Sequence, residues 1–259
     1  SRIYLILGNN FLYYMCQQDE VKTYLDKEPR ILNRHIYIQQ RYLNRGGKYM
    51  EDKKINRAFN EMYIVAQKRL ENRSPIDIAK KAGVVFCEDT STLKIKSLDK
   101  TIELIYPSYE PKQKLEDWYI LILLHYLDIA DGTPISYKAV HFGELKDGLI
   151  RGVRFDKTVE GELGRFLFNK EPEQVINVCK SLGAEIIESK FDLCAVFHLF
   201  PNYLITLNIW FADEEFEASG KMLVDKSADH YLTMEDSVMV GEFMLRCISE
   251  RYNQLYDIL

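Results

Sequence analysis

Apolar residues after position 50 recur with both helical and strand spacing. Apolar positions three and four apart predict amphipathic helices over residues 53–72, 158–168, 171–182 and 233–252. The segment 114–130 is apolar on nearly every side, which is typical of a helix in the middle of a core. The pattern therefore predicts several helices that each bury at least one face.

A short helix after residue 74 is bounded by recognisable end signals. Ser74 suits the N-cap, Pro75 suits the first helical position, and Asp77 complements the positive end of the helix dipole. Gly83 suits the left-handed residue that follows many helices. We therefore predict a helix that ends just before Gly83.

Strand patterns occur in neighbouring pairs. Residues 84–87, 92–98 and 101–106 read as short strands, with a tight turn between the last two. Residues 193–199 and 203–211 form the clearest hairpin, and both segments are apolar on both faces. This second hairpin is expected to lie in a sheet that is covered on each side.

The glycine-rich stretch 135–155 has a weaker pattern. It carries Gly143, Gly148 and Gly152, from which we expect loops with a short helix or strand. No repeat, low-complexity tract or linker interrupts residues 50–259. The whole pattern predicts a single α+β domain over residues 50–259, with a mainly antiparallel sheet packed by helices.

The charge of the chain argues against two classes of partner. The net charge is −5 and the isoelectric point is near 5.7, whereas a general nucleic-acid binder normally carries a basic face. An anionic membrane surface is disfavoured for the same reason. The longest apolar runs are also too short to span a bilayer. We expect a cytoplasmic protein with no nucleic-acid or membrane partner.

The first 49 residues differ in composition from the rest. They hold eight Lys or Arg and four Asp or Glu, which leaves 26 basic and 35 acidic residues for the remainder. Asn44 to Met50 can be back-translated as a purine-rich ribosome-binding site, a spacer and a start codon. We therefore interpret residues 1–49 as a translated leader or a disordered extension, with Met50 as the natural start.

The five cysteines, at positions 16, 87, 179, 194 and 247, are scattered. None forms a Cys-x-x-Cys pair, so neither a disulfide framework nor a zinc or iron–sulfur motif is indicated. The cofactor, if one exists, is unknown from the sequence.

The strongest chemical feature is an acidic motif at the end of an apolar strand. Trp210 is followed by the consecutive carboxylates Asp213, Glu214 and Glu215, and then by Phe216. Three adjacent negative charges repel one another, so the segment needs solvent, a cation or nearby donors. The motif is therefore a candidate ligand site.

Further candidates follow within thirty residues. If the chain after the hairpin returns to the last helix, Asp225, Tyr231 and Glu235 would converge with the acidic motif around a shared cavity. Asp213, Asp225 and His230 are the weaker candidates for a metal site, because carboxylate oxygens and imidazole nitrogens ligate metal ions. A structural corner, in which the carboxylates cap backbone N–H groups, is the alternative.

Four segments together resemble a known family. They are His125-Tyr126-Leu127, Trp210-x-x-Asp213-Glu214-Glu215-Phe216-x-Ala218-Ser219, Asp225-x-Ser227-Ala228 and Tyr231-Leu232-x-x-Glu235-Asp236. They are similar to the hallmarks of domain of unknown function 3786, a bacterial and archaeal family found largely in anaerobes. Some relatives carry an added cysteine-rich iron–sulfur module, but this chain has no such cluster.

The function that these observations favour is binding. We expect an accessory protein of anaerobic metabolism whose ligand, a small molecule or a protein, contacts the region around the acidic motif. A metal-dependent enzyme that uses the same carboxylates is the competing hypothesis, and the structural corner is the third.

Overall fold

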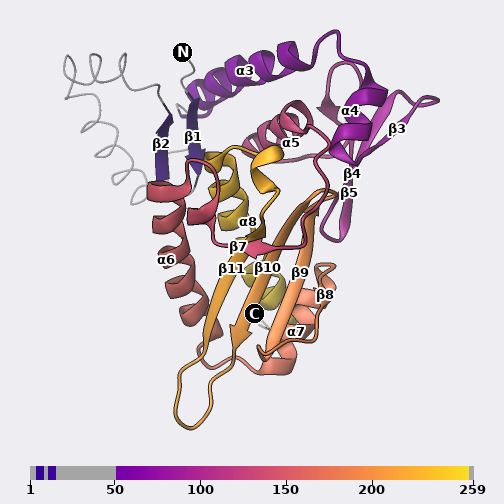
Figure 1. The fold of residues 1–259 in the computed structure, drawn as a ribbon. Helices are drawn as coiled ribbons and strands as arrows, with labels where there is room; N and C mark the ends of the chain where they lie inside the picture. The colour runs from indigo at the N-terminus through magenta and orange to yellow at the C-terminus, as the bar shows by residue number, and fades with distance from the viewer. Residues whose placement is uncertain (1–3, 9–10, 16–50, 257–259) are drawn as a thin grey trace. The chain divides into compact units, whose positions relative to one another are not determined.

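The computed structural model describes residues 4–8, 11–15 and 51–256, with side chains from residue 59 onward (Figure 1). The chain divides into two compact units. The first comprises residues 1–69 and 116–121, and the second comprises residues 70–115 and 122–259.

The first unit contains a hairpin and a helix. β1 (Tyr4–Gly8) pairs antiparallel with β2 (Phe11–Met15), and α3 (Glu51–Leu70) follows where apolar spacing predicts a helix. The leader hypothesis for residues 1–49 falls mostly outside the described residues, so it stays a prediction.

A five-stranded sheet organises the second unit. The strand order is β7-β11-β10-β9-β8, and every neighbouring pair is antiparallel. The strands are β7 (Ala139–Val140), β8 (Glu185–Ile186), β9 (Leu193–Phe200), β10 (Tyr203–Trp210) and β11 (Ser219–Asp225). Every residue of β10 except Trp210 is buried, so this central strand is covered on both faces, as its apolar sequence predicts.

A second antiparallel sheet has the order β3-β4-β5-β6. Its strands are β3 (Val85–Cys87), β4 (Thr92–Ser97), β5 (Lys100–Ile105) and β6 (Glu110–Pro111). The predicted turn between β4 and β5 contains Leu98 at φ 54°. The Leu98 N–H donates to the carbonyl of His198 on β9 at 3.0 Å, so this turn joins the two sheets.

Five α-helices follow α3 among the described residues. The α-helices are α4 (Pro75–Ala82), α5 (Asp117–Ile129), α6 (Gly148–Leu167), α7 (Pro172–Ser181) and α8 (Met234–Tyr256). Two 3₁₀ turns, η1 (Phe142–Glu144) and η2 (Ala228–His230), lie in the connections. α8 contacts both α6 and α7, and α6 runs alongside β11 (Figure 1).

The end signals of α4 are confirmed. The Ser74 Oγ accepts a hydrogen bond from the Asp77 N–H at 3.4 Å, and Pro75 occupies the first turn. Gly83 adopts the left-handed conformation at φ 68°, and its N–H donates to the Ala79 carbonyl.

The start of α6 corrects the expectation for residues 135–155. The helix begins at Gly148, ten residues before the predicted start at Thr158. Two of the three glycines, Gly148 and Gly152, therefore lie inside the helix. A Cβ on Gly148 or Gly152 would lie 2.4 or 2.3 Å from the Phe142 carbonyl oxygen. These glycines therefore let α6 approach the backbone of η1, rather than marking a loop.

The strand β11 was missing from the predicted elements. It pairs with β10 from Ile205↔Val224 to Trp210↔Ser219, and its exposure alternates along its length. Residues 211–218 of the acidic motif consequently form the loop of a β10–β11 hairpin. The strand β11 separates this loop from the candidates Tyr231 and Glu235 and ends at the candidate Asp225.

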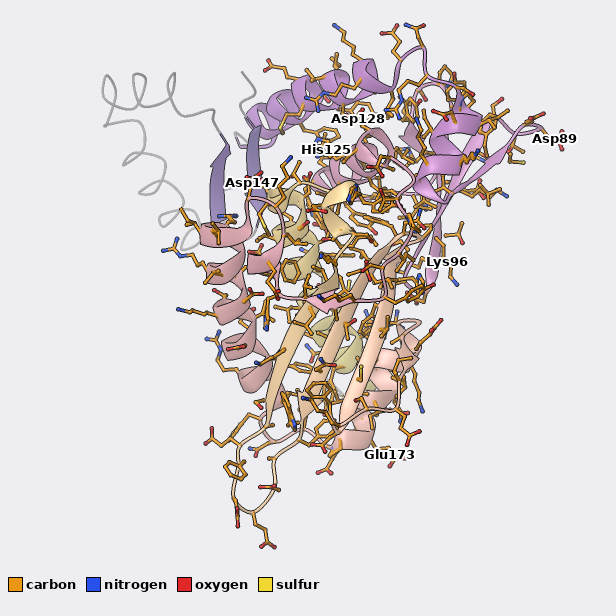
Figure 2. The ribbon with its side chains drawn as sticks, in the orientation of Figure 1. Asp89, Lys96, His125, Asp128, Asp147 and Glu173 are labelled. Atoms are coloured by element: carbon orange, nitrogen blue, oxygen red, sulfur yellow. The ribbon has the colours of Figure 1, made fainter. Side chains whose placement is uncertain are left out.

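The predicted α+β class with mainly antiparallel sheets is confirmed. Figure 2 shows how side chains fill the space around the helices and strands, with His125 and Asp128 on α5 and Asp147 at the start of α6. Among the described residues, no helix combines the length and the apolar character needed to cross a membrane.

Candidate functional site

The acidic loop, residues 211–218, folds around Asp213. The Asp213 Oδ1 accepts the N–H groups of Glu215 and Phe216, each at 2.8 Å, and the Asp213 N–H donates to the Phe216 carbonyl at 3.0 Å. The two N–H groups lower the pKa of the Asp213 carboxyl. The first carboxylate of the motif therefore caps a tight turn, as the structural-corner alternative expects.

Most residues of the acidic loop are exposed, and Trp210 lies just before the loop at the end of β10. Trp210 packs edge-on against Phe191 with ring centroids 4.6 Å apart, while Phe216 is 70% exposed. Glu214, Glu215 and Glu217 are exposed, and within the described ranges no salt bridge joins them to a basic side chain.

Asp225 lies at the opposite end of β11 from the acidic loop. The strand runs from Ser219 to Asp225, which corresponds to about 20 Å at 3.3 Å per residue. The expectation that Asp213, Glu214 and Asp225 converge around one cavity is therefore wrong. The reason is that the connecting residues form a straight, fully paired strand instead of a returning loop.

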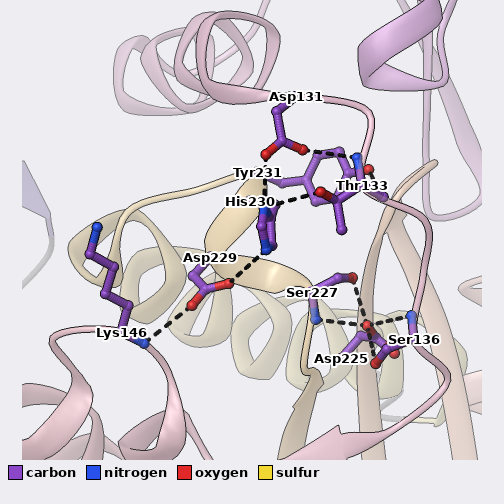
Figure 3. A network of polar contacts seen from close by, with 9 residues as sticks. All are labelled: Asp131, Thr133, Ser136, Lys146, Asp225, Ser227, Asp229, His230 and Tyr231. Atoms are coloured by element: carbon purple, nitrogen blue, oxygen red, sulfur yellow. Dashed lines mark hydrogen bonds and ion pairs between the residues drawn. The ribbon is translucent and has the colours of Figure 1, made fainter.

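Asp225 is buried, and one of its carboxylate oxygens accepts four hydrogen bonds. Its Oδ1 accepts the N–H and Oγ–H of Ser136, at 3.0 and 2.8 Å, and the N–H and Oγ–H of Ser227, at 2.9 and 2.6 Å (Figure 3). Burial raises the pKa of Asp225, but the hydrogen bonds from Ser227 and Ser136 outweigh it and leave the pKa lowered.

Asp225 helps to hold the strap, which we define as residues 131–138 between α5 and β7. The Tyr231 hydroxyl donates to the Thr133 carbonyl, and the Lys226 N–H donates to the Lys138 carbonyl at 2.9 Å. Burial raises the pKa of Tyr231, and the charge of Asp131 adds to this effect. The strap is thus bonded to residues 225–231 along its length.

A group of polar side chains, the His230 cluster, lies where the strap meets η2; we define it as Asp131, Thr133, Asp229 and His230 (Figure 3). The His230 Nδ1 lies 2.8 Å from the Asp131 Oδ2 and 3.1 Å from the Thr133 Oγ1. The His230 Nε2 lies 3.9 Å from the Asp229 Oδ1. The His230 side chain is 46% exposed, so solvent reaches the cluster.

The Asp131 carboxylate of the cluster is held in its ionised form. Desolvation raises the pKa of Asp131, but hydrogen bonds from His230 and Thr133 outweigh it and lower the pKa to about 2. Because a carboxylate only accepts hydrogen bonds, Asp131 fixes the proton of a neutral His230 ring on Nδ1. In that tautomer the His230 Nε2, which lies 3.9 Å from the Asp229 Oδ1, carries a lone pair.

Two further residue pairs connect the family-like segments around His125, Tyr231 and Asp236. Tyr126 stacks on Tyr231 with ring centroids 5.8 Å apart, and its hydroxyl donates to the Ala82 carbonyl at 2.6 Å. The His125 Nδ1 lies 3.0 Å from the Asp236 Oδ1, and both side chains are buried. Three of the four resembling segments therefore meet at one end of the sheet, and the acidic motif does not.

Glu235 has a smaller role than its neighbour. It lies half-buried in the first turn of α8, whereas Asp236 bonds both His125 and Thr233. The sequence singled out Asp225, Tyr231 and His230, which lie on the segment bonded to the strap, but it did not single out Asp131, Thr133 and Ser136. Their only signal is the polar segment that ends the apolar helix at residue 130.

The three metal candidates are not brought together. Asp213 lies at the far end of β11, and Asp225 bonds two serines rather than His230. Among the residues that the structure describes, no group of three or more His, Cys, Asp or Glu is arranged to hold a metal ion.

A family comparison identifies residues 74–247 as a match to the family described as domain of unknown function, DUF3786. No curated protein and no solved structure matches the chain significantly. The matched range includes both the acidic loop and the His230 cluster.

Proposed function

We propose that this chain, which belongs to the family described as domain of unknown function DUF3786, is a binding protein whose ligand contacts the His230 cluster. The observation that carries the proposal is the 3.9 Å separation between the His230 Nε2 and the Asp229 Oδ1. This distance exceeds a hydrogen bond, so both atoms keep an acceptor position for another molecule.

The chemistry of these acceptors defines the ligand class. With its proton on Nδ1, a neutral His230 presents a lone pair on Nε2, and Asp229 presents a carboxylate oxygen beside it. A group with several N–H donors and a positive charge satisfies both acceptors at once. The ligand is therefore a small organic cation that carries an ammonium or guanidinium group.

The rigid surroundings of the cluster also support binding. Asp225 fixes the strap through Ser136, and Tyr231 fixes it through Thr133. The two sides of the cluster, which are 99 residues apart in the chain, are thus held in place before any ligand arrives. Preorganised polar groups bind more tightly because less freedom is lost on association.

The acidic loop supports small-molecule binding less well. Asp213 uses its Oδ1 for the turn, and the exposed glutamates face solvent without a converging partner. Isolated solvent-exposed charges contribute little to affinity.

The test is a titration calorimetry panel at low salt with agmatine and putrescine as cationic probes and succinate as the anionic comparator. We expect at least one diamine-type probe to bind and succinate not to bind. Asp229→Asn and Asp131→Asn should each weaken that binding by at least about tenfold, which corresponds to 1.4 kcal/mol.

The matched control is the double substitution Glu214→Gln and Glu215→Gln, which removes two charges from the acidic loop. It should change affinity by less than about twofold, since these side chains lie at the other end of β11. Loss of binding in this control, with normal binding in Asp229→Asn, would place the ligand at the acidic loop. Failure of every cationic probe would reject the ligand class.

A further inference from the structure

We propose that α6 is a dimerisation surface, which pairs antiparallel with the α6 of a second copy of this chain about a two-fold axis. In this arrangement the acidic loop of each copy lies beside the basic half of α6 in the other copy. The inference is independent of the His230 cluster.

One face of α6 is exposed over its whole length. The buried face consists of Gly148, Gly152, Phe155, Val159, Leu163 and Leu167. The opposite stripe consists of Ile150, Val153, Arg154, Lys157, Gly161, Gly164, Arg165 and the C-cap residue Phe168. All of them are exposed except Gly164, which is half-buried. At 100° per residue these eight positions lie within about 60° of one line.

The two ends of this stripe are apolar. Ile150 is 86% exposed and Phe168 is 68% exposed. They are separated by 18 residues, about five helical turns, so they lie on the same side of the helix. Exposed apolar side chains of this size at both ends of one helix face are typical of an interaction surface.

Two glycines lie near the centre of the stripe. A Cβ on Gly161 would have no neighbour within 4 Å, and one on Gly164 would meet only the Ala218 carbonyl oxygen at 3.8 Å. Small residues let two helices approach closely.

An antiparallel register matches these features in pairs. Placing Ile150 opposite Phe168 of the second copy also places Arg154 opposite Gly164, and Lys157 opposite Gly161. Arg154 and Lys157 then each meet a glycine, Ile150 meets Phe168, and Val153 meets Arg165. A two-fold axis makes every such pair occur twice, so the contact closes as a dimer.

Charge complementarity identifies the occupant as a second copy. The acidic loop adjoins the C-terminal half of α6, because Ala218 lies against Gly164. The basic residues Arg154 and Lys157 lie nearer the N-terminal end of α6. Within one copy, the acidic loop extends away from that end of the helix (Figure 1). Antiparallel pairing therefore brings the loop's unpaired carboxylates toward Arg154 and Lys157 of the other copy.

Cysteine cross-linking tests the register. The full-length variants Ile150→Cys and Phe168→Cys are oxidised separately and as a mixture, and disulfides are mapped by peptide mass spectrometry. Two copies of position 150 would be about 27 Å apart at 1.5 Å per residue, so neither variant alone should cross-link at this site. The mixture should form the 150–168 disulfide between chains. Glu162→Cys, which lies off the stripe, is the control.

Sedimentation measurements test the contact itself. We expect a dimer whose dissociation constant rises at least about tenfold in the double variant Arg154→Glu and Lys157→Glu. Adding Glu214→Lys and Glu215→Lys to that variant should restore dimerisation, whereas Thr158→Glu should have little effect. A monomer at every concentration, a 150–150 disulfide, or a cross-link from position 150 to residues 1–49 of the same chain would overturn the proposal.

Discussion

His125 and Asp236 form a buried pair that ties the middle of α5 to the first turn of α8. The His125 Nδ1 lies 3.0 Å from the Asp236 Oδ1. The Asp236 Oδ2 accepts the Thr233 hydroxyl at 2.7 Å, and the Asp236 N–H donates to the Thr233 Oγ1 at 3.2 Å. Thr233 thus accepts an N–H group of the first turn of α8, and the Asp236 carboxylate holds the Thr233 hydroxyl while it joins α8 to a helix 111 residues earlier in the chain.

Asp236→Ala should lower the free energy of unfolding by about 3 kcal/mol, because it removes a charge-assisted bond and leaves His125 and Thr233 without this acceptor. Urea unfolding should show a lower midpoint with an unchanged slope. Glu235→Ala is the matched control, since it loses only a favourable dipole contact worth less than about 1 kcal/mol. Equal effects from the two variants would contradict a specific role for Asp236.

Asp225→Ala should loosen the strap without disturbing the acidic loop. Four hydrogen bonds to the Asp225 Oδ1 are lost, including those from Ser136 on the strap. Hydrogen–deuterium exchange should accelerate in residues 131–138 and stay unchanged in residues 211–218.

Asp213→Ala should accelerate hydrogen–deuterium exchange in residues 211–218 and leave exchange in residues 131–138 unchanged. The reason is that it removes the acceptor of the two N–H groups that close the acidic loop. Faster exchange of the strap in this variant would indicate that the two regions are coupled after all.

Asp131 should make stability depend on acid pH. The folded-state pKa of Asp131, about 2, lies below its ordinary value of 3.8. A carboxylate with a depressed folded-state pKa adds to the free energy of unfolding. This contribution is fully present above the ordinary pKa and is lost as the pH falls from about 4 toward 2, where the carboxylate becomes protonated. Urea midpoints should therefore be lower in Asp131→Asn at pH 6, and the difference from the parent chain should shrink at pH 3. A difference that stays constant with pH would show that charge is not responsible.

Gly152→Ala should be strongly destabilising despite the high helix propensity of alanine. The new methyl group would lie 2.3 Å from the Phe142 carbonyl oxygen, so α6 and η1 would have to separate. We expect a loss of about 2 kcal/mol or more in thermal or urea unfolding. Thr158→Ala, on the exposed side of the same helix, should change stability by less than about 0.5 kcal/mol. A stabilising effect of Gly152→Ala would contradict the close approach.

Local signals were sufficient for much of the fold. The ends of α4 follow from Ser74, Pro75 and Gly83, whose preferences depend on local backbone geometry and on a hydrogen bond within the first turn. The β9–β10 hairpin follows from two apolar runs around a short turn.

Tertiary contacts determine what the sequence did not predict. Gly148 and Gly152 resemble loop residues until the neighbouring η1 backbone is known. The short strand β11 has few strongly apolar residues and is specified by pairing with β10. The His230 cluster depends on Asp131, which is 99 residues from His230, and no local pattern records that contact.

The most direct test of the proposed binding site is an NMR titration that follows the imidazole ¹⁵N resonances while agmatine is added at low salt. We predict that the His230 ring resonances move and saturate, while those of the buried His125 and the amide resonances of residues 211–218 stay in place. Saturating shifts confined to residues 211–218, with His230 unmoved, would contradict the His230 cluster as the ligand site.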